Sequence, residues 1–269
     1  MKLYIIKIGG NVIDDEKQLS SFLNDFASVS ESKILVHGGG KIATELSKQL
    51  GIEAKMVDGR RITDADTLKV VQMVYGGLIN KNIVAQLQSR NCNSIGLTGA
   101  DANIILATKR AVSPTLEGVG GGLDYGFVGD IAKVNSEKLN ALLNSSFTPI
   151  IAPLTHDGKG QMLNTNADTM ASAISIAMTT WGEVNLIYCF EKSGVLKNVE
   201  DDNSVIEKMN HADYEKYKGE GIISKGMIPK LDNAFEAIKQ GVKSVIICHA
   251  KDLKKVAAGQ KAGTTLLSF

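Results

Sequence analysis

Short apolar runs alternate with longer segments of helical periodicity, and this alternation constrains the fold most. The runs are almost continuously apolar, as in residues 3–8 (LYIIKI) and 33–37 (KILVH), which is typical of strands covered on both faces. Strands that alternate with helices form βαβ units around a mostly parallel sheet. We therefore predict an α/β fold. The predicted strands are residues 3–8, 33–37, 94–97, 148–153, 185–190 and 244–248. The predicted helices between them include residues 42–50, 65–75, 136–144, 168–178 and 229–240.

One segment interrupts this alternation. A glycine-rich stretch at residues 117–126 (EGVGGGLDYG) lies between two strand-like segments, 104–112 and 127–134. This arrangement predicts a β-hairpin that leaves the α/β core. The chain has only 4 prolines and no low-complexity linker, so composition does not locate a domain boundary.

Charge and apolar content exclude several classes of partner. The 269 residues include 30 Lys and Arg and 29 Asp and Glu. The chain therefore lacks the excess of basic residues that binding to nucleic acids or anionic membranes requires. No apolar run reaches the length of a membrane span, and the first residues lack the features of a signal peptide. We expect a cytoplasmic protein with neither nucleic acid nor membrane as partner.

The cysteine pattern argues against a disulfide framework or a cysteine zinc site. Cys92, Cys189 and Cys248 are far apart in the sequence. Cys189 and Cys248 lie in apolar strand-like runs, so we predict buried structural thiols.

Glycines follow the first two predicted strands. Gly9 and Gly10 come after Lys7 and Ile8, and residues 38–40 (GGG) come after His37 and lead into a helix. Glycines at the carboxyl end of a parallel strand let backbone N–H groups approach a ligand, and a helix N-terminus adds partial positive charge. Tight turns are the alternative, but two such loops with a lysine favour an anion site. His37 itself is interpreted as a packing and hydrogen-bonding residue rather than a metal ligand or base.

The common phosphate-binding fingerprints do not fit these loops. Ile42 follows Gly40 and Lys41 where a P-loop requires Ser or Thr, and Leu123 breaks a G-x-G-x-x-G pattern in the glycine-rich segment. The sequence therefore supports neither a P-loop fold nor a dinucleotide-binding domain, and it argues against an oxidoreductase.

A series of motifs resembles the amino-acid kinase family over nearly the whole chain. Within this family the NTNAD and GRRIT motifs favour the branch that phosphorylates acylglutamate over carbamate, aspartate or uridylate kinases. The motifs are, in order, IIKIGGN, LVHGGGK, DGRRITDAD, GLTGADANII, GFVGDI, MLNTNAD, GIISKGMIPKLDNA and AGTTL.

The resemblance implies a three-layer αβα sandwich around a mainly parallel eight-stranded sheet. Residues 1–175 would form the lobe that binds the acyl amino acid, with the hairpin, and residues 176–269 would bind ATP. The implied reaction transfers the γ-phosphoryl group of MgATP to the side-chain carboxylate of N-acetyl-L-glutamate in arginine biosynthesis. The resemblance also implies a homodimer that arginine does not inhibit. A non-catalytic member of the fold is the alternative, and intact lysines argue against it.

The same resemblance assigns the site residues. Lys7 and Lys230 would neutralise the phosphoryl group, and Asp168 would hold both lysines in place. For Asp168 alone, helix capping would be the better interpretation. Lys225 lies five residues before Lys230 and would not share its helix face, so the motif selects Lys230. The remaining assignments are backbone N–H donors at Gly10, Gly39 and Gly40, and substrate contacts from Arg61 and Asn164.

The chemistry requires cations more than a base. A glutamate side chain has a pKa of about 4.3 and is already ionised at neutral pH. The obstacle is the approach of one anion to another, so catalysis consists of positioning and electrostatic stabilisation. Two lysines and several N–H donors meet that requirement. Arg61 could belong to a solvated basic patch with Arg60 and Lys55, but its planar fork suits a substrate carboxylate.

Two positions depart from the family pattern. Phe190 and Glu191 stand where a Ser/Thr-Asp pair is expected, so Glu191, with Gly194, is the predicted nucleotide contact. Arg60 replaces an apolar residue close to the acyl group. Because an arginine there would find a partner if the acyl group ended in a carboxylate, N-succinyl-L-glutamate is the alternative substrate. The competing interpretation places Arg60 in solvent.

Overall fold

An eight-stranded sheet forms the centre of the molecule. The computed structural model describes residues 2–53, 55–57, 60–112, 122–223 and 226–268. The six strands from β13 to β5 are parallel, and β14 runs antiparallel to β13. The spatial order is β12 (Lys208–Met209), β14 (Thr264–Leu266), β13 (Ser244–His249), β11 (Glu183–Phe190), β1 (Lys2–Ile8), β2 (Ser32–His37), β8 (Thr148–Ile151) and β5 (Ser94–Leu97).

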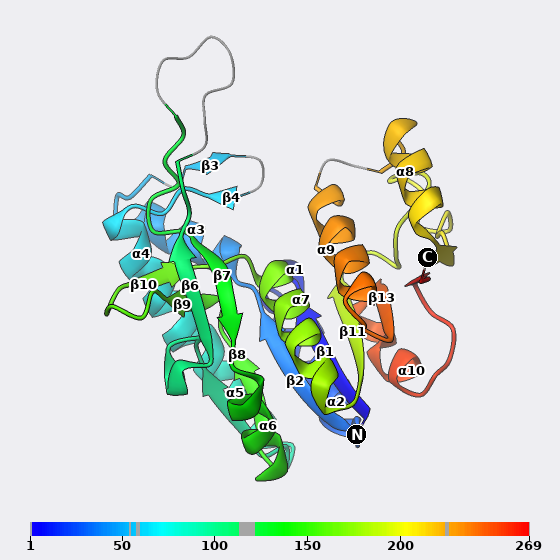
Figure 1. The fold of residues 1–269 in the computed structure, drawn as a ribbon, viewed down its shortest axis with the longest axis horizontal. Coiled ribbons are helices and arrows are strands. Elements are labelled where there is room, and N and C mark those ends of the chain that lie inside the picture. Colours follow the sequence, from blue (N-terminus) through cyan, green and yellow to red (C-terminus); the bar gives the residue numbers. More distant parts are fainter. Residues whose placement is uncertain (1, 54, 58–59, 113–121, 224–225, 269) are drawn as a thin grey trace.

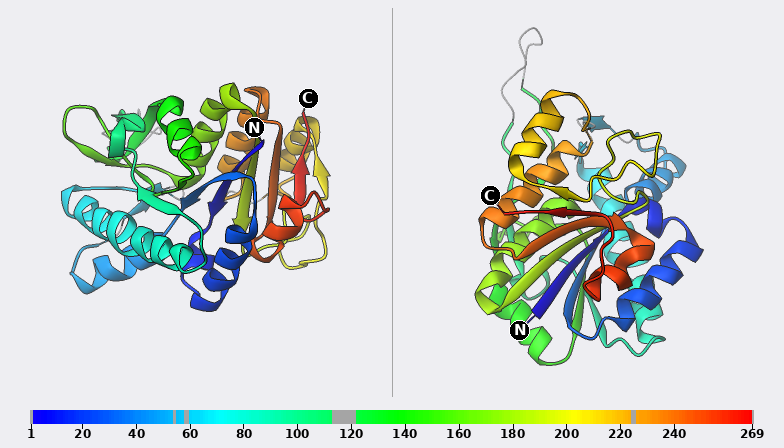
Figure 2. Two further views of the ribbon diagram at one scale, coloured as in Figure 1. Left: turned by 90° about the horizontal axis from the view of Figure 1, so that it is seen from below. Right: turned by 90° about the vertical axis from the view of Figure 1, so that its right-hand side faces the viewer.

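Helices cover both faces of this sheet, as Figure 2 shows on its left side. Successive side chains of a strand point to opposite faces, so Leu3 and Ile5 enter one core while Tyr4 and Ile6 enter the other. The first core also takes residues from α6 (Ser136–Asn144), α7 (Ala167–Met178), α8 (His211–Gly219) and α9 (Ile228–Lys239). The second takes residues from α2 (Glu16–Ser28), α3 (Gly40–Gln49), α4 (Ala65–Val71), α5 (Asn80–Gln88) and α10 (Leu253–Ala257). The predicted αβα sandwich is confirmed.

A second sheet of four strands stands beside the central one. Its order is β10 (Met162–Asn164), β9 (Leu154–His156), β6 (Ile105–Lys109) and β7 (Gly129–Val134). β6 and β7 pair antiparallel and lie side by side in Figure 1, so the predicted hairpin is present. Gly118, Gly120 and Gly121 of the predicted loop lie outside the described residues. Close by, β3 (Met56–Val57) pairs with β4 (Arg60–Arg61).

One helical segment differs from the prediction in length and type. We expected a helix over residues 65–75, but α4 continues into a π-helix, η1 (Gln72–Ile79), and then into α5. Residues 76 and 77 are both glycine and do not end the helix. π-Helical turns are rare and often lie at functional sites. Here η1 packs beside Gly39, because a Cβ added there would meet Ile79 and Tyr75.

The short elements complete the chain. They are α1 (Gly10–Ile13) and the 3₁₀ turns η2 (Asp101–Asn103), η3 (Thr179–Trp181) and η4 (Ala250–Asp252). All three cysteines are free and buried, as predicted. Across the described residues, no helix is both long enough and apolar enough to cross a membrane. Position 175, the predicted lobe boundary, falls inside α7, so the functional division into two lobes stays a prediction.

Candidate active site

The two glycine loops meet at the carboxyl ends of β1 and β2. These strands are paired in register up to Ile8 and His37, and the N–H group of Gly38 donates to Ile8 O at 3.2 Å. α1 then begins at Gly10 and α3 at Gly40. Gly10, Gly39 and Gly40 line one cavity of about 620 Å³. The amino end of α3 therefore faces this cavity, where free N–H groups and the helix dipole favour an anion.

Three charged side chains converge on the same cavity. Lys7 lies on β1, Asp168 is in the first turn of α7, and Lys230 is in the first turn of α9. Lys7 Nζ lies 2.7 Å from Asp168 Oδ1, and Lys230 Nζ donates a hydrogen bond to Asp168 Oδ2. Each carboxylate oxygen thus holds one ammonium group. The side chains of Lys7 and Asp168 are buried, whereas that of Lys230 is 26% exposed.

This arrangement fixes the charge states. Burial alone would raise the pKa of Asp168, but the charges of Lys7 and Lys230 outweigh it and lower the pKa to about 2. Burial lowers the pKa of Lys7, and the adjacent Lys230 charge lowers it further, while Asp168 opposes both effects. The cluster therefore carries one more positive than negative charge when both lysines are protonated, which suits an anionic guest.

Phe190 supports both ammonium groups through its ring. Lys7 Nζ lies 4.8 Å and Lys230 Nζ 4.7 Å from the ring centroid, within the range of a cation–π interaction. The Phe190 ring stacks on Tyr188, with centroids 6.1 Å apart and planes 6° apart. An aromatic residue therefore stands where the family pattern suggested hydrogen-bonding side chains, and it positions the lysines.

The start of α7 holds Asp168 in place. Asn166 caps this helix, and its Oδ1 accepts hydrogen bonds from the N–H groups of Asp168 at 2.9 Å and Thr169 at 3.0 Å. The hydroxyl of Tyr188 donates to Asp168 O at 3.2 Å. Asp168 is thus a first-turn residue, and Asn166 does the capping, which leaves the Asp168 carboxylate to the lysines.

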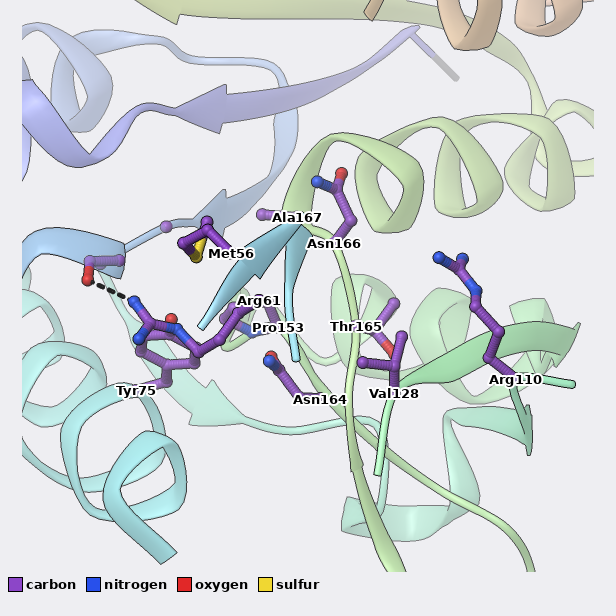
Figure 3. A pocket seen from close by; sticks show the side chains of 13 residues that line it. Met56, Arg61, Tyr75, Arg110, Val128, Pro153, Asn164, Thr165, Asn166 and Ala167 are labelled. Atoms are coloured by element: carbon purple, nitrogen blue, oxygen red, sulfur yellow. Dashed lines mark hydrogen bonds between the residues drawn. The ribbon is translucent and has the colours of Figure 1, made fainter. Parts of the chain in front are cut away.

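A second cavity, of about 200 Å³, adjoins the first and shares Gly38, Gly39, Gly40 and Arg61 with it. Arg61 Nη2 donates to Gly40 O at 2.9 Å and to Thr44 Oγ1 at 2.7 Å. Arg61 Nη1 is buried without a hydrogen-bond partner among the described residues. Figure 3 shows Arg61 beside Tyr75 on one side of this cavity. A guanidinium held by one nitrogen, with the other free, is suited to a ligand carboxylate.

Asn164 lies on the cavity wall between Arg61 and Arg110 (Figure 3). Its Nδ2 donates to Thr63 Oγ1 at 3.0 Å, and its backbone N–H donates to Phe127 O at 2.8 Å. These bonds fix the amide while its carbonyl oxygen remains available to a ligand.

The structure places the other predicted residues as follows. Glu191 lines the larger cavity and its Oε1 accepts a hydrogen bond from Asn11 Nδ2 at 2.8 Å. Gly194 is buried and lines neither cavity; a Cβ there would lie 2.8 Å from Thr264 Oγ1. The side chain of Arg60, and Lys225 as a whole, lie outside the described residues.

His37 lies beneath the glycine loop and lines neither cavity. Its Nδ1 lies 2.8 Å from Gly38 O and its Nε2 lies 3.2 Å from Asn80 Nδ2. Burial lowers the pKa of His37 to about 4. A neutral ring that donates from Nδ1 and accepts at Nε2 satisfies both contacts. This agrees with the packing and hydrogen-bonding role that the sequence indicated.

Sequence reasoning did not single out Thr44, Tyr75, Arg110, Asn166 or Phe190 for roles in the site. Thr44 lies one helical turn after Gly40, so the position of the glycine motif could have indicated that Thr44 lies near the site. Tyr75 depends on the π-helix, and Arg110 depends on the hairpin, so neither leaves a local signal.

The comparisons with known proteins agree with this geometry. The model of the amino acid kinase family matches residues 2–249. A mostly parallel sheet with glycine loops, two lysines and one aspartate at its carboxyl edge defines the class of protein. The chain belongs to the amino acid kinase family.

Sequence relatives narrow the class further. The chain is 61% identical over 268 residues to the acetylglutamate kinase of Cytophaga hutchinsonii, with 99% of each chain covered. It is 55% identical to that of Bacteroides fragilis, with 91% of each chain covered. These relatives confirm the predicted resemblance to acetylglutamate kinases within the family.

Solved structures confirm the fold. N-acetylglutamate synthase from Neisseria gonorrhoeae superimposes with a TM-score of 0.81 at 18% identity, covering 99% of this chain and 59% of the synthase chain. Carbamate kinase from Giardia gives a TM-score of 0.68 at 13% identity, covering 99% of this chain and 98% of the kinase.

Proposed function

We propose that this protein phosphorylates the side-chain carboxylate of N-acetyl-L-glutamate with MgATP, giving an acyl phosphate and ADP. The Lys7–Asp168–Lys230 cluster between the two glycine loops is the observation that carries this proposal. High identity to acetylglutamate kinases supports the substrate and a place in arginine biosynthesis.

The reaction follows from the charges of the site. A carboxylate oxygen of the substrate attacks the γ-phosphorus, and the bond from that phosphorus to the β,γ-bridging oxygen breaks as ADP leaves. Lys7 and Lys230 offset the negative charge on the transferring group, and N–H groups of Gly10, Gly39 and Gly40 donate to its oxygens. Asp168 keeps the lysines apart and aligned.

Binding of the amino-acid part belongs to the smaller cavity. Arg61 Nη1 would pair with the α-carboxylate, and the side-chain oxygen of Asn164 would accept a hydrogen bond from the acyl-amide N–H at the same end of the substrate. Glu191, at the rim of the larger cavity, would bind a ribose hydroxyl of ATP. Gly194 is a weaker candidate, because packing against Thr264 accounts for it.

The test is ADP release with MgATP and N-acetyl-L-glutamate, combined with hydroxylamine trapping of the acyl phosphate. We expect equal amounts of ADP and hydroxamate, neither of them without the acyl amino acid. Carbamate in place of acetylglutamate is the control for the carbamate kinase alternative. ADP release without hydroxamate would contradict carboxylate phosphorylation.

The assembly and location follow as proposals from the same resemblance. We propose a homodimer, and sedimentation velocity would show twice the mass of the 28.7 kDa chain. The requirement for ATP supports a cytoplasmic location.

A further inference from the structure

The smaller cavity has a second arginine opposite Arg61. Figure 3 shows Arg110 across the cavity from Arg61, with Asn164 and Val128 between them. Residues 127 and 128 connect the backbone that carries Arg61 with the backbone that carries Arg110. The N–H group of Phe127 donates to Thr63 O at 2.6 Å, and that of Arg110 donates to Val128 O at 2.8 Å. The hairpin therefore carries Arg110 to the end of the cavity remote from Arg61.

Arg110 is held in a fixed orientation. Its Nε lies 3.0 and 3.1 Å from the two carboxylate oxygens of Asp130, and its Nη2 also donates to Asp130. Its Cζ lies 5.3 Å from the centroid of the Tyr125 ring. The hydrogen bond to Asp130 raises the pKa of Arg110, so the guanidinium remains charged.

One nitrogen of this guanidinium is left without a hydrogen-bond partner in the described part of the chain. Arg110 Nη1 is buried and has no hydrogen-bond partner among the described residues, as is also true of Arg61 Nη1. No other guanidinium nitrogen of the described residues is in this state. A buried donor left without an acceptor costs free energy that a ligand oxygen would restore. The cavity therefore has an unsatisfied cationic donor at each end.

The proposed substrate supplies carboxylates for only part of this set of cations. The side-chain carboxylate of an acylglutamate faces Lys7 and Lys230, and its α-carboxylate pairs with Arg61. An acetyl group ends in a methyl, so the only acceptor that it offers Arg110 is its uncharged carbonyl oxygen. A carboxylate at the end of the acyl chain would accept from Arg110 Nη1, on the edge of the guanidinium that Asp130 leaves free.

Resting on the proposed function, we propose that the acyl group of the preferred substrate ends in a carboxylate, as in N-succinyl-L-glutamate, and that Arg110 determines this specificity. The sequence analysis assigned the same hypothesis to Arg60, whose side chain lies outside the described residues. The contacts of Arg110 provide a structural basis for it. Asp130 offsets part of the Arg110 charge, so the contribution is a directed, charge-assisted hydrogen bond rather than a broad field.

The experiment compares kcat/KM for N-acetyl-, N-butyryl- and N-succinyl-L-glutamate. N-butyryl-L-glutamate has the same number of acyl carbons as the succinyl substrate and lacks its charge. Wild type is measured with Arg110→Met and Arg60→Leu. The matched control is Arg90→Met, because Arg90 pairs with Asn24 and Ser20 away from both cavities. Thermal denaturation verifies that each variant is folded.

We expect wild type to prefer the succinyl substrate over the butyryl one. Arg110→Met should lower kcat/KM for succinylglutamate by about 10- to 100-fold, as for a lost hydrogen bond to a charged group. The loss should lie in KM, with less than about threefold change for acetylglutamate, because uniform binding is removed. Arg90→Met should leave the preference unchanged.

Several outcomes would overturn the inference. A wild-type preference for acetylglutamate would do so while leaving the proposed function intact. Loss of the succinyl preference in Arg60→Leu but not in Arg110→Met would reassign specificity to Arg60. An equal loss for all three substrates in Arg110→Met would make Arg110 a contact to their shared part. Turnover of none of them by wild type would instead refute the proposed function.

Discussion

At the scale of single residues, the site depends on one carboxylate that serves two cations. Asp168 pairs with Lys7 through Oδ1 and with Lys230 through Oδ2, and Phe190 offers its ring to both ammonium groups. None of these side chains is required as a base, since the proposed nucleophile is already ionised. In the proposed reaction, their contribution is to place positive charge where the transferring group gains negative charge.

Removal of one lysine should therefore affect the chemical step more than binding. We expect Lys230→Gln to lower kcat by about 10²- to 10³-fold, comparable to the loss of an oxyanion-hole donor. The KM for acetylglutamate should change little, because the contact forms mainly in the transition state. Steady-state kinetics test this, with Lys192→Gln as control, since Lys192 forms an exposed pair with Asp202. Equal losses in both variants would contradict the assignment.

Loss of Asp168 should affect stability as well as activity. Asp168→Asn leaves a buried ammonium group at Lys7 without its counter-ion, which costs about 3–5 kcal/mol when a buried pair is broken. Urea denaturation at pH 7 measures this loss. Asp202→Asn is the matched control, because its ion pair is exposed and such pairs contribute little. An unchanged free energy of unfolding in Asp168→Asn would show that the cluster does not need its carboxylate.

At the scale of elements, the glycine loop after β2 and the π-helix η1 form one unit. Gly39 has φ 146°, in the region that favours glycine, and an added Cβ would lie 2.2 Å from Ile79 Cδ1. The π-helix brings Ile79 against the loop and Tyr75 to the smaller cavity. A side chain at Gly39 would therefore displace Ile79 and also strain the backbone.

A methyl group at Gly39 should disturb the whole unit. Gly39→Ala combines backbone strain of about 1–3 kcal/mol with the contact to Ile79, so we expect lower stability and a raised KM for acetylglutamate. Thermal denaturation and kinetics check both effects. Gly77→Ala is the control, since an added Cβ meets nothing within 4 Å there. A Gly39→Ala variant as stable and active as Gly77→Ala would refute the argument.

Periodicity predicted the central elements well and the irregular ones poorly. β5 and α6 lie where residues 94–97 and 136–144 were predicted, because a buried strand and an amphipathic helix each leave a local pattern. The π-helix leaves none, since it depends on packing against the glycine loop. The second sheet was predicted only as a hairpin, because β9 and β10 are three residues each and pair with distant partners.

The same distinction applies to the site. The glycines, the two lysines and the aspartate lie in motifs that can be recognised in the sequence. The convergence of Lys7, Asp168 and Lys230 could therefore be predicted. Phe190 and Arg110 contact residues that are distant from them in the sequence, such as Lys7 and Lys230 for Phe190 and Asp130 for Arg110. Their roles follow only from the fold.

At the scale of the whole molecule, stability should depend on pH through groups beneath and within the site. His37 has a folded pKa of about 4, below its ordinary 6.5, because it is buried. Between these values the unfolded chain binds more protons than the folded one, so stability falls as the pH falls. Asp168, with a folded pKa of about 2, continues the loss below pH 4.

The His37 contribution can be isolated. Lowering the pH from 6.5 to 4 should remove about 3 kcal/mol of unfolding free energy through His37 alone. His37→Gln should flatten this part of the stability profile, whereas His156→Gln should not. NMR titration of His37 in wild type provides a second measurement that does not depend on the variant folding. A His37 ring that titrates near pH 6.5 in the folded protein would contradict the expectation.

The glycine loops also have a consequence for how such a site tolerates sequence drift. Gly10, Gly39 and Gly40 line the larger cavity, where their peptide N–H groups are the proposed donors, and every residue except proline carries that group. No ordinary replacement at these positions deletes the donor; it can only add bulk that moves it. Part of the proposed phosphate site thus belongs to the backbone itself, and the mutations that would damage it are those that change the shape of the loops.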